Sequence, residues 1–461
     1  MSSERPAVPD GSGEPWEQML RAMLGPGADD AIRELRERGI DPSAMAGLPT
    51  DPAQLQQAFA QMQSMLAASG DEPVNWQMAH DLARQQASAE GDPSLSPAQT
   101  RQVLEALAVA ELWLDAATEL PPASGSPRAW SRAEWVEATL PTWRTLTEPV
   151  ASSLSNALVG TLGDAMGEGL GGLDGELPGG IDATQLLRRL GSAVFGLQVG
   201  QAAGTLARDV FGTTDIGLPL LASPTPALVA SNVDAFAAGL DAPADEVRLF
   251  LALREAAATR LFTHVPWLRA HLLAAVESYA RGITIDADQL EEAVRSIDPT
   301  DAAALQQALS GGVFAPHTTP EQKAALERLE TALALVEGWV DEVASAAAMP
   351  HLPHTVALRE MIRRRRAAGG PAENTFSTLV GLELRPRRLR DAAALWSQIA
   401  RDSGTAARDA VWDHPDLLPT AQDLDDPAGY AGRRAAAVDE AAEVDRALAE
   451  ILGEDPEGPS A

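Results

Sequence analysis

The sequence predicts a mainly α-helical protein: a multi-helix body with little strand, a helical N-terminal arm and disordered termini. Aromatic residues make up only 4% of the chain and hydrophobic residues 45%, so the core is expected to consist mainly of Leu, Val and Ala side chains. Apolar residues recur at three- and four-residue steps over long stretches, which is typical of helices. Runs of alternating Val, Ile, Thr and Tyr are never longer than a few residues, so strand signals are scarce.

The 461 residues are expected to form three parts. Residues 1–72 predict a flexible N-terminal segment, in which short helical patterns separated by Asp-Pro and Gly-rich breaks form an arm from Trp16 to about Ala68. Residues 73–427 predict the helical body. Residues 428–461 predict a C-terminal helix and, after Gly453, a disordered acidic tail.

The charge and composition exclude several classes of protein. The formal net charge is −31, and such a field repels phosphate groups and anionic lipid, so we expect no nucleic acid and no membrane as partners. Because the chain has no cysteine, it has no disulfide, no thiolate catalysis and no zinc–thiolate site. The N-terminus has no apolar segment of a secretory signal, and the most apolar stretch, Leu190–Ala207, is interrupted by glutamines. We therefore expect a soluble cytoplasmic protein.

The most informative feature is a helix predicted over about residues 244–262. A proline precedes it, two acidic residues occupy its first turn, and Pro266 ends the run. Arg254 and Ala258 fall on its apolar stripe one turn apart, so the Arg254 side chain is expected to point into the interior. A buried arginine needs a carboxylate partner, because an unpaired buried charge is costly.

A second long helix, predicted from Pro320 to Ala348, supplies a candidate for that partner. Its Leu and Val residues form one stripe, and Glu337 lies within it. We therefore predict an ion pair between Arg254 and Glu337, with Asp341 as a further candidate partner.

Three glycine-rich patterns precede these helices. Gly196, Gly200 and Gly204 recur every four residues in a helical pattern, which predicts the close approach of a second helix; the order of a phosphate-binding loop is absent. The segment Leu154–Gly180 predicts a mobile loop or lid, with disorder as the alternative. The segment Val210–Leu221 predicts a short strand or an irregular connection.

Two clusters of side chains allow more than one interpretation. Four tryptophans between Trp113 and Trp143 favour a packed corner of loop and helix, and the alternative is an aromatic wall for a peptide or other ligand. The run Arg363–Arg366 and the arginines at 385, 387, 388 and 390 favour helix-surface side chains paired with carboxylates. The alternative for these arginines is a phosphate or nucleic-acid site. His351 and His354 favour a polar loop rather than a pair of metal ligands.

Several motifs within residues 73–427 point to one family. Residues 253–269 read Leu-Arg-Glu-Ala-Ala-Ala-Thr-Arg-Leu-Phe-Thr-His-Val-Pro-Trp-Leu-Arg. The others are Pro-Val-Asn-Trp at 73–76, Trp-Ser-Arg-Ala-Glu-Trp at 130–135, Gly-Leu-Gln-Val-Gly at 196–200 and Leu-Val-Glu-Gly-Trp-Val-Asp at 335–341. Together they resemble the actinobacterial zincin-like metallopeptidases, zinc-dependent enzymes often described as putative hydrolases. The Val-Pro-Trp-Leu-Arg turn is the most specific of these motifs, and the resemblance implies a zincin-like helical body.

The resemblance also implies a His-Glu-x-x-His helix, in which the two histidines hold zinc and the glutamate polarises the metal-bound water. Glu255 matches that catalytic glutamate, whereas Arg254 and Ala258 stand at the two histidine positions. Glu337 matches the glutamate of a downstream Glu-Gly-His segment, in which Trp339 replaces the histidine. The motif is therefore degenerate. The family implies zinc, but we expect neither zinc nor another cofactor in this chain.

These observations favour a family member that is catalytically impaired and acts as a structural or peptide- or protein-binding protein with an unknown partner. Arg254, Ala258 and Glu337 would then be former metal-site positions. The alternative is an active hydrolase with an altered site and Glu255 as general base, which would lack the metal that makes water reactive near neutral pH. A third hypothesis is a binding protein that uses the Trp113–Trp143 surface or the Arg363–Arg366 cluster.

Overall fold

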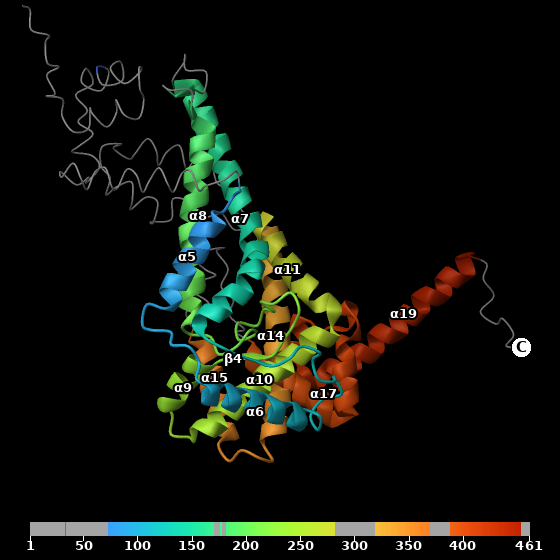
Figure 1. Cartoon of the computed structure of the whole chain (residues 1–461). Helices are drawn as coiled ribbons and strands as arrows, with labels where there is room; N and C mark the ends of the chain where they lie inside the picture. Colours follow the sequence, from blue (N-terminus) through green and yellow to red (C-terminus); the bar gives the residue numbers. More distant parts are fainter. Residues whose placement is uncertain are drawn as a thin grey trace, which may run out of the picture. The chain divides into compact units, whose positions relative to one another are not determined.

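The computed structural model describes residues 33, 72–169, 176–177, 181–281, 319–368 and 388–452, and most of them belong to helices (Figure 1). The predicted fold class, a multi-helix body with little strand, is confirmed. The N-terminal arm predicted up to Ala68 (Arg33 apart) and the tail predicted after Gly453 lie outside the described residues. No helix among those described is both long and apolar enough to cross a membrane.

The chain divides into two compact units, each assembled from segments that are distant in sequence. The first unit comprises residues 1–82, 147–200 and 280–320, and the second comprises residues 83–146, 201–279 and 321–461. The positions singled out in the sequence as site residues all belong to the second unit. The three-part division at residues 72/73 and 427/428 stays a prediction.

In the first unit, the start of α5 (Trp76–Ala87) packs closely against α8 (Ala183–Ala207). A Cβ atom on Gly196 would lie 2.6 Å from the carbonyl oxygen of Asn75, and one on Gly200 would lie 2.7 Å from that of Ala79. A side chain at either position would therefore push the two backbones apart. The close helix approach predicted from the glycine spacing is confirmed.

The lid predicted over Leu154–Gly180 is wrong for its first part. Helix α7 (Arg132–Gly169) continues through Gly169, because Ala, Leu and Val alternate with the glycines and sustain the helix. Two short strands, β2 (Glu176–Leu177) and β3 (Ile181–Asp182), form an antiparallel pair after it. The other residues of the segment lie outside the described ranges.

In the second unit, α10 (Ala244–His264) is the central helix. It packs against α6 (Pro97–Leu114), α9 (Ala230–Ala238), α15 (Thr355–Ala367) and β4 (Ala227–Val229) (Figure 1). Every residue of α10 from Phe250 to Phe262 is buried. The sequence predicted one apolar stripe, but the helix is enclosed on all sides, so its polar side chains need partners within the protein.

The neighbours of α10 have clear sequence origins. Helix α6 begins at a capping box, in which the Ser96 hydroxyl accepts a hydrogen bond from the Gln99 backbone N–H and the Gln99 side-chain oxygen accepts one from the Ser96 backbone N–H. Strand β1 (Arg128–Trp130) pairs in parallel with β4, and the segment Val210–Leu221 is irregular apart from one bridge between Gly212 and Leu228.

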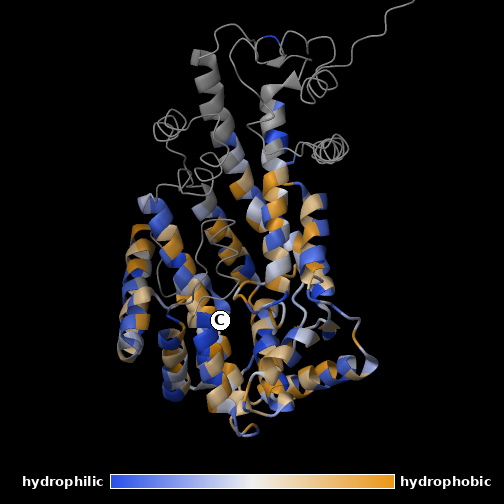
Figure 2. Cartoon of the chain, turned by 90° about the vertical axis from the view of Figure 1, so that its left-hand side faces the viewer, coloured by the Kyte–Doolittle hydropathy of each residue, from blue (hydrophilic) through white to orange (hydrophobic). Residues whose placement is uncertain are grey.

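Polar and apolar residues form stripes along the helices (Figure 2). The remaining helices are α11 (Pro266–Arg281), α14 (Pro320–Ala348), α17 (Leu389–Ala410), α18 (Ala421–Asp425) and α19 (Tyr430–Leu452).

Candidate functional site

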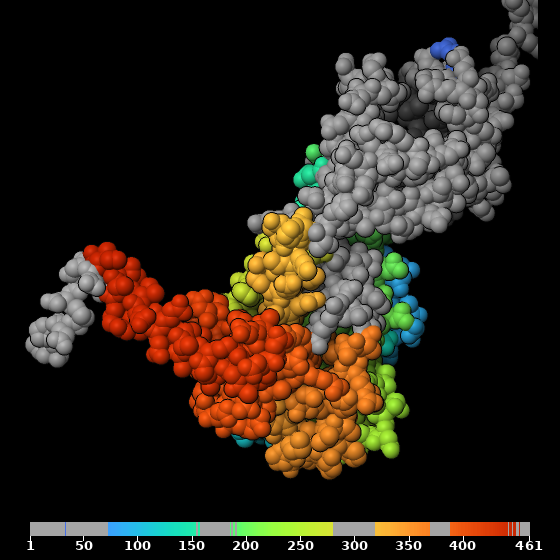
Figure 3. Space-filling model, turned by 180° about the vertical axis from the view of Figure 1, so that it is seen from behind, coloured from blue at the N-terminus to red at the C-terminus, as the bar shows by residue number. Residues whose placement is uncertain are grey.

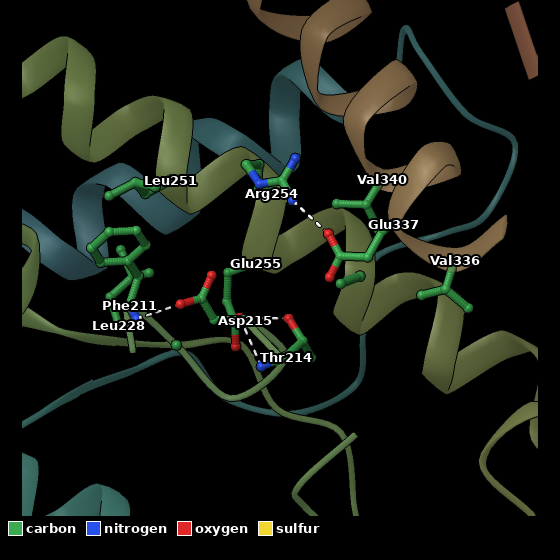
Figure 4. A pocket seen from close by; sticks show the side chains of 12 residues that line it. Phe211, Thr214, Asp215, Leu228, Leu251, Arg254, Glu255, Val336, Glu337 and Val340 are labelled. Atoms are coloured by element: carbon green, nitrogen blue, oxygen red, sulfur yellow. Dashed lines mark hydrogen bonds and ion pairs between the residues drawn. The ribbon is translucent and has the colours of Figure 1, made fainter. Parts of the chain in front are cut away.

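The ion pair predicted between α10 and α14 is present. Nη2 of Arg254 donates to Oε2 of Glu337 across 2.9 Å, and the two side chains are 10% and 5% exposed (Figure 4). Nη1 of Arg254 lies 3.8 Å from Oδ1 of Asp341, the further partner predicted from the sequence. A charge-assisted pair of this kind fixes the distance between the two helices at the centre of the unit.

Helix α15 supplies more guanidinium groups to the same carboxylates. Arg366 donates to the second oxygen of Glu337. Asp341, whose side chain is fully buried, accepts from Arg359 and Arg363, with N–O distances of 2.7 and 2.6 Å. The two buried carboxylates of α14 are thus neutralised by arginines of α10 and α15, and we call this group the arginine–carboxylate network: Arg254, Glu337, Asp341, Arg359, Arg363 and Arg366.

Arg365 extends this set of charges toward the irregular segment before β4. It donates to the backbone oxygen and the carboxylate of Asp209, each at 2.7 Å, and to Asp215 at 3.3 Å, and its guanidinium lies 4.0 Å from the ring centre of Phe211. Burial opposes ionisation of Asp215, but Arg365 and Arg366 outweigh it and hold the pKa of Asp215 below its ordinary value. For Asp209, burial dominates and raises the pKa.

Glu255, on the other side of a small cavity from Arg254 and Glu337, holds the irregular segment before β4 in place. Its Oε1 accepts from the backbone N–H and hydroxyl of Thr213, at 2.9 and 2.5 Å, and from the backbone N–H of Ala227 at 3.3 Å. Its Oε2 accepts from the backbone N–H and hydroxyl of Thr214, at 3.2 and 2.6 Å. Five donors therefore surround a carboxylate that has about four lone-pair sites. Burial raises the pKa of Glu255, although these hydrogen bonds oppose the shift.

Gly212, whose backbone lies against the Glu255 carboxylate, has no room for a side chain. A Cβ atom on Gly212 would overlap the Glu255 carboxylate and would lie 2.8 Å from the carbonyl oxygen of Ala227. The backbone at Gly212 is therefore packed directly against both the Glu255 carboxylate and the first residue of β4, Ala227. The arrangement has the character of a structural anchor.

A small cavity lies between Glu255 and the network (Figure 4). Its volume is about 20 Å³, enough for about one water molecule. Ala258 contributes to its wall and offers no polar atom. The other lining residues are Phe211, Gly212, Thr214, Asp215, Leu228, Leu251, Arg254, Glu255, Val336, Glu337 and Val340.

The histidines described in the second unit lie in ordinary environments. His354 pairs with Glu246 at 3.0 Å, and His351 stacks on the ring of Trp113 at 4.2 Å, as expected for a polar loop. His264, at the end of α10, is exposed. Within residues 72–169, 181–281, 319–368 and 388–452, no three His, Asp or Glu side chains gather in a way that could hold a metal ion.

The sequence favoured a packed corner for the tryptophans and carboxylate-paired surface positions for the arginines, and the structure differs from this in one respect. Trp135 and Trp143 are completely buried, which supports the packed corner over the aromatic wall. The arginines do pair with carboxylates, as Arg388 does with Asp425. The difference is that three of the four in Arg363–Arg366 are only 11 to 21% exposed, so they belong to the core of the site rather than to a helix surface.

Comparison with known proteins identifies the family. Residues 74–431 match the model of the zincin-like metallopeptidases, and the chain belongs to this family. The structure is similar to the crystal structure of a putative hydrolase with a novel fold from Chloroflexus aurantiacus, with 20% sequence identity and a TM-score of 0.55. The similarity covers 78% of this chain and 98% of that one, and at this identity it shows a shared fold. No curated protein matches the chain.

Proposed function

We propose that this chain is a family member in which Arg254 and Ala258 replace the zinc-binding histidines, and that it is catalytically impaired and acts as a structural or protein-binding protein. The observation that carries the proposal is the contact between Arg254 and Glu337. A guanidinium occupies the position where the family motif has its first histidine, and it neutralises a carboxylate that would otherwise be available to a cation.

The side chains at this position do not fit a zinc ion. Arg254 has no acceptor atom, and Ala258 has no donor atom for a metal. Glu337 already accepts from two arginines, and Asp341 accepts from Arg359 and Arg363. Zinc would have to displace these guanidinium groups, and the described residues that line the cavity include no histidine.

The alternative, an active hydrolase with Glu255 as general base, finds less support in the geometry. A general base needs an oxygen within hydrogen-bond distance of the water or substrate from which it takes a proton. Both oxygens of Glu255 already accept hydrogen bonds from Thr213 and Thr214. The role of Glu255 that these contacts favour is to hold the segment Gly212–Ala227 against α10.

The small cavity also bears on what the protein binds. A space for about one water molecule admits no peptide side chain, let alone an extended peptide. A partner bound by this fold therefore requires a different surface. The site at Glu255 and Arg254 is better suited to stabilise the second unit than to contact a substrate.

The proposal is tested by assaying the full chain for peptidase activity on fluorescent casein and on a quenched-peptide mixture, with added zinc and with a zinc chelator. We expect no zinc-dependent hydrolysis from the wild type. The variants Glu255→Gln and Glu246→Gln serve as a pair, because both residues lie on α10 and Glu246 contacts His354 instead of the cavity. Hydrolysis that Glu255→Gln but not Glu246→Gln removes would reject the proposal in favour of the hydrolase, and its loss on chelation would show that a metal takes part.

A further inference from the structure

Between α17 and the start of α19 lies a groove, in the part of the second unit drawn in orange-red and red (Figure 3). Its volume is about 570 Å³, which is within the range of small-molecule sites. A break in α17 shapes the groove: Gly404 has a φ of 88°, a conformation that favours glycine, and residues on both sides of it line the groove. The groove shares no lining residue with the cavity at Glu255.

The walls of this α17–α19 groove are mostly apolar. Ile399 and Val411 of α17 are buried, whereas Val438 of α19 is 61% exposed. The space between the helices exists because much of the lining has no side chain beyond a methyl group, namely Ala407, Ala410, Ala431 and Ala435. An apolar ligand in this space would remove Val438 from water, which is favourable.

Two carboxylates line the groove, one from each helix. Asp402 of α17 accepts from the side-chain amide of Gln398 at 2.6 Å, and neither Asp402 nor Asp439 of α19 forms an ion pair with another described residue. Arg434 is the only basic residue among the described residues that line the groove, and it donates to the backbone oxygen of Asp416. Asp439 lies five residues further along α19, about 7.5 Å along the helix axis, so its end of the groove is negative.

These charges select the class of ligand. The net charge of −31 raises the local concentration of cations around the protein. A ligand ammonium group would meet two carboxylates without cationic partners, whereas a ligand carboxylate would be repelled by both. The apolar walls require that the rest of the ligand be a hydrocarbon chain or ring.

We propose that the α17–α19 groove binds a small organic cation, an amine with an apolar chain, whose ammonium group pairs with Asp402 and Asp439 and whose chain covers Val438. This inference goes beyond the proposed function, because it adds a ligand site to a protein whose former metal-site positions lie elsewhere in the second unit. It uses neither Glu255 nor any residue of the arginine–carboxylate network. Its outcome is therefore separate from that of the proposed function.

The test is calorimetric titration of the full chain with octylammonium, below its aggregation concentration. Octanoate has the same chain with the opposite charge, and ethylammonium has the same charge with a short chain. We expect one octylammonium per chain, and at least about tenfold weaker binding of both other compounds. No binding of octylammonium, or binding of octanoate that is as tight, would overturn the proposal.

A matched pair of variants separates the groove from the general negative field. Asp402→Asn/Asp439→Asn removes the two groove carboxylates, and Glu440→Gln/Glu443→Gln removes two exposed carboxylates of α19 that do not line the groove. Both variants change the net charge equally. We expect the first to bind octylammonium at least about fivefold more weakly than wild type and the second to stay within about twofold of wild type. Equal binding by the two variants would overturn the proposal.

A second pair tests the apolar part of the site. Ala435→Trp places a large side chain in the groove, whereas Ala436→Trp places it on an exposed position outside the lining. We expect Ala435→Trp to weaken octylammonium binding at least about tenfold, the effect of leaving two methylene groups in water, and Ala436→Trp to leave it unchanged. Undiminished binding by Ala435→Trp would show that the ligand lies elsewhere and would also overturn the proposal.

Discussion

Replacing Arg254 with alanine removes the α10 contribution to the arginine–carboxylate network. Removing one partner of a buried ion pair costs about 3–5 kcal/mol when the other charge is left uncompensated. Here Glu337 keeps its contact with Arg366, and Asp341 keeps Arg359 and Arg363. We therefore expect Arg254→Ala to lower the free energy of unfolding by about 2–3 kcal/mol, close to the value of a lost charge-assisted hydrogen bond.

Arg248 offers a matched control on the same helix. Its side chain is 10% exposed, as is that of Arg254, but its partners Asp234 and Asp245 are 40 and 84% exposed. Solvent screens those carboxylates, so Arg248→Ala should cost about 1 kcal/mol or less. Urea unfolding followed by far-UV circular dichroism compares the two variants with wild type. If Arg254→Ala costs no more than Arg248→Ala, the reasoning about the network is wrong.

Three further predictions concern the same region. Glu255→Gln should lose about 2 kcal/mol in urea unfolding, because an amide nitrogen cannot accept the hydrogen bonds that the carboxylate receives, and an unchanged midpoint would refute the anchor role. Because the folded pKa of Asp215 is lowered, its contribution to stability is present above its unfolded pKa of about 4 and is lost as pH falls through the folded value. The stability difference between wild type and Asp215→Asn should thus shrink on acidification, and a constant difference in urea titrations would contradict this. Arg254→His/Ala258→His recreates two imidazoles one turn apart and should gain zinc binding by calorimetry, whereas Ala258→His alone should not.

The sequence predicted the long helices well because their signals are local. Pro243 with the acidic first turn marks the start of α10, and the predicted bounds Pro320–Ala348 of α14 agree with the structure. The pairing of Arg254 with Glu337 was also predictable, since each is a charged residue on an otherwise apolar stripe. Burial of an unpaired charge is costly enough to force such partners together.

The rest of the site could not be predicted, because it depends on contacts between distant segments. Arg359, Arg363 and Arg366 are spaced by four and three residues, so they share one face of α15, but nothing local shows that this face is buried. The Thr213–Thr214 pair has no motif that marks it as a donor set for Glu255. The stripe predicted for α10 also left Glu255 outside the core, whereas the structure encloses the helix on every side.

The central claim is that the arginine–carboxylate network occupies the position of the family's metal centre. The most direct test is elemental analysis of tag-free full-length protein, before and after incubation with excess zinc and desalting, with Arg254→His/Ala258→His as the positive control. The account predicts negligible zinc in both wild-type samples. About one zinc ion per wild-type chain, retained through desalting, would contradict it and would show that the chain holds a metal with ligands other than those of the family motif.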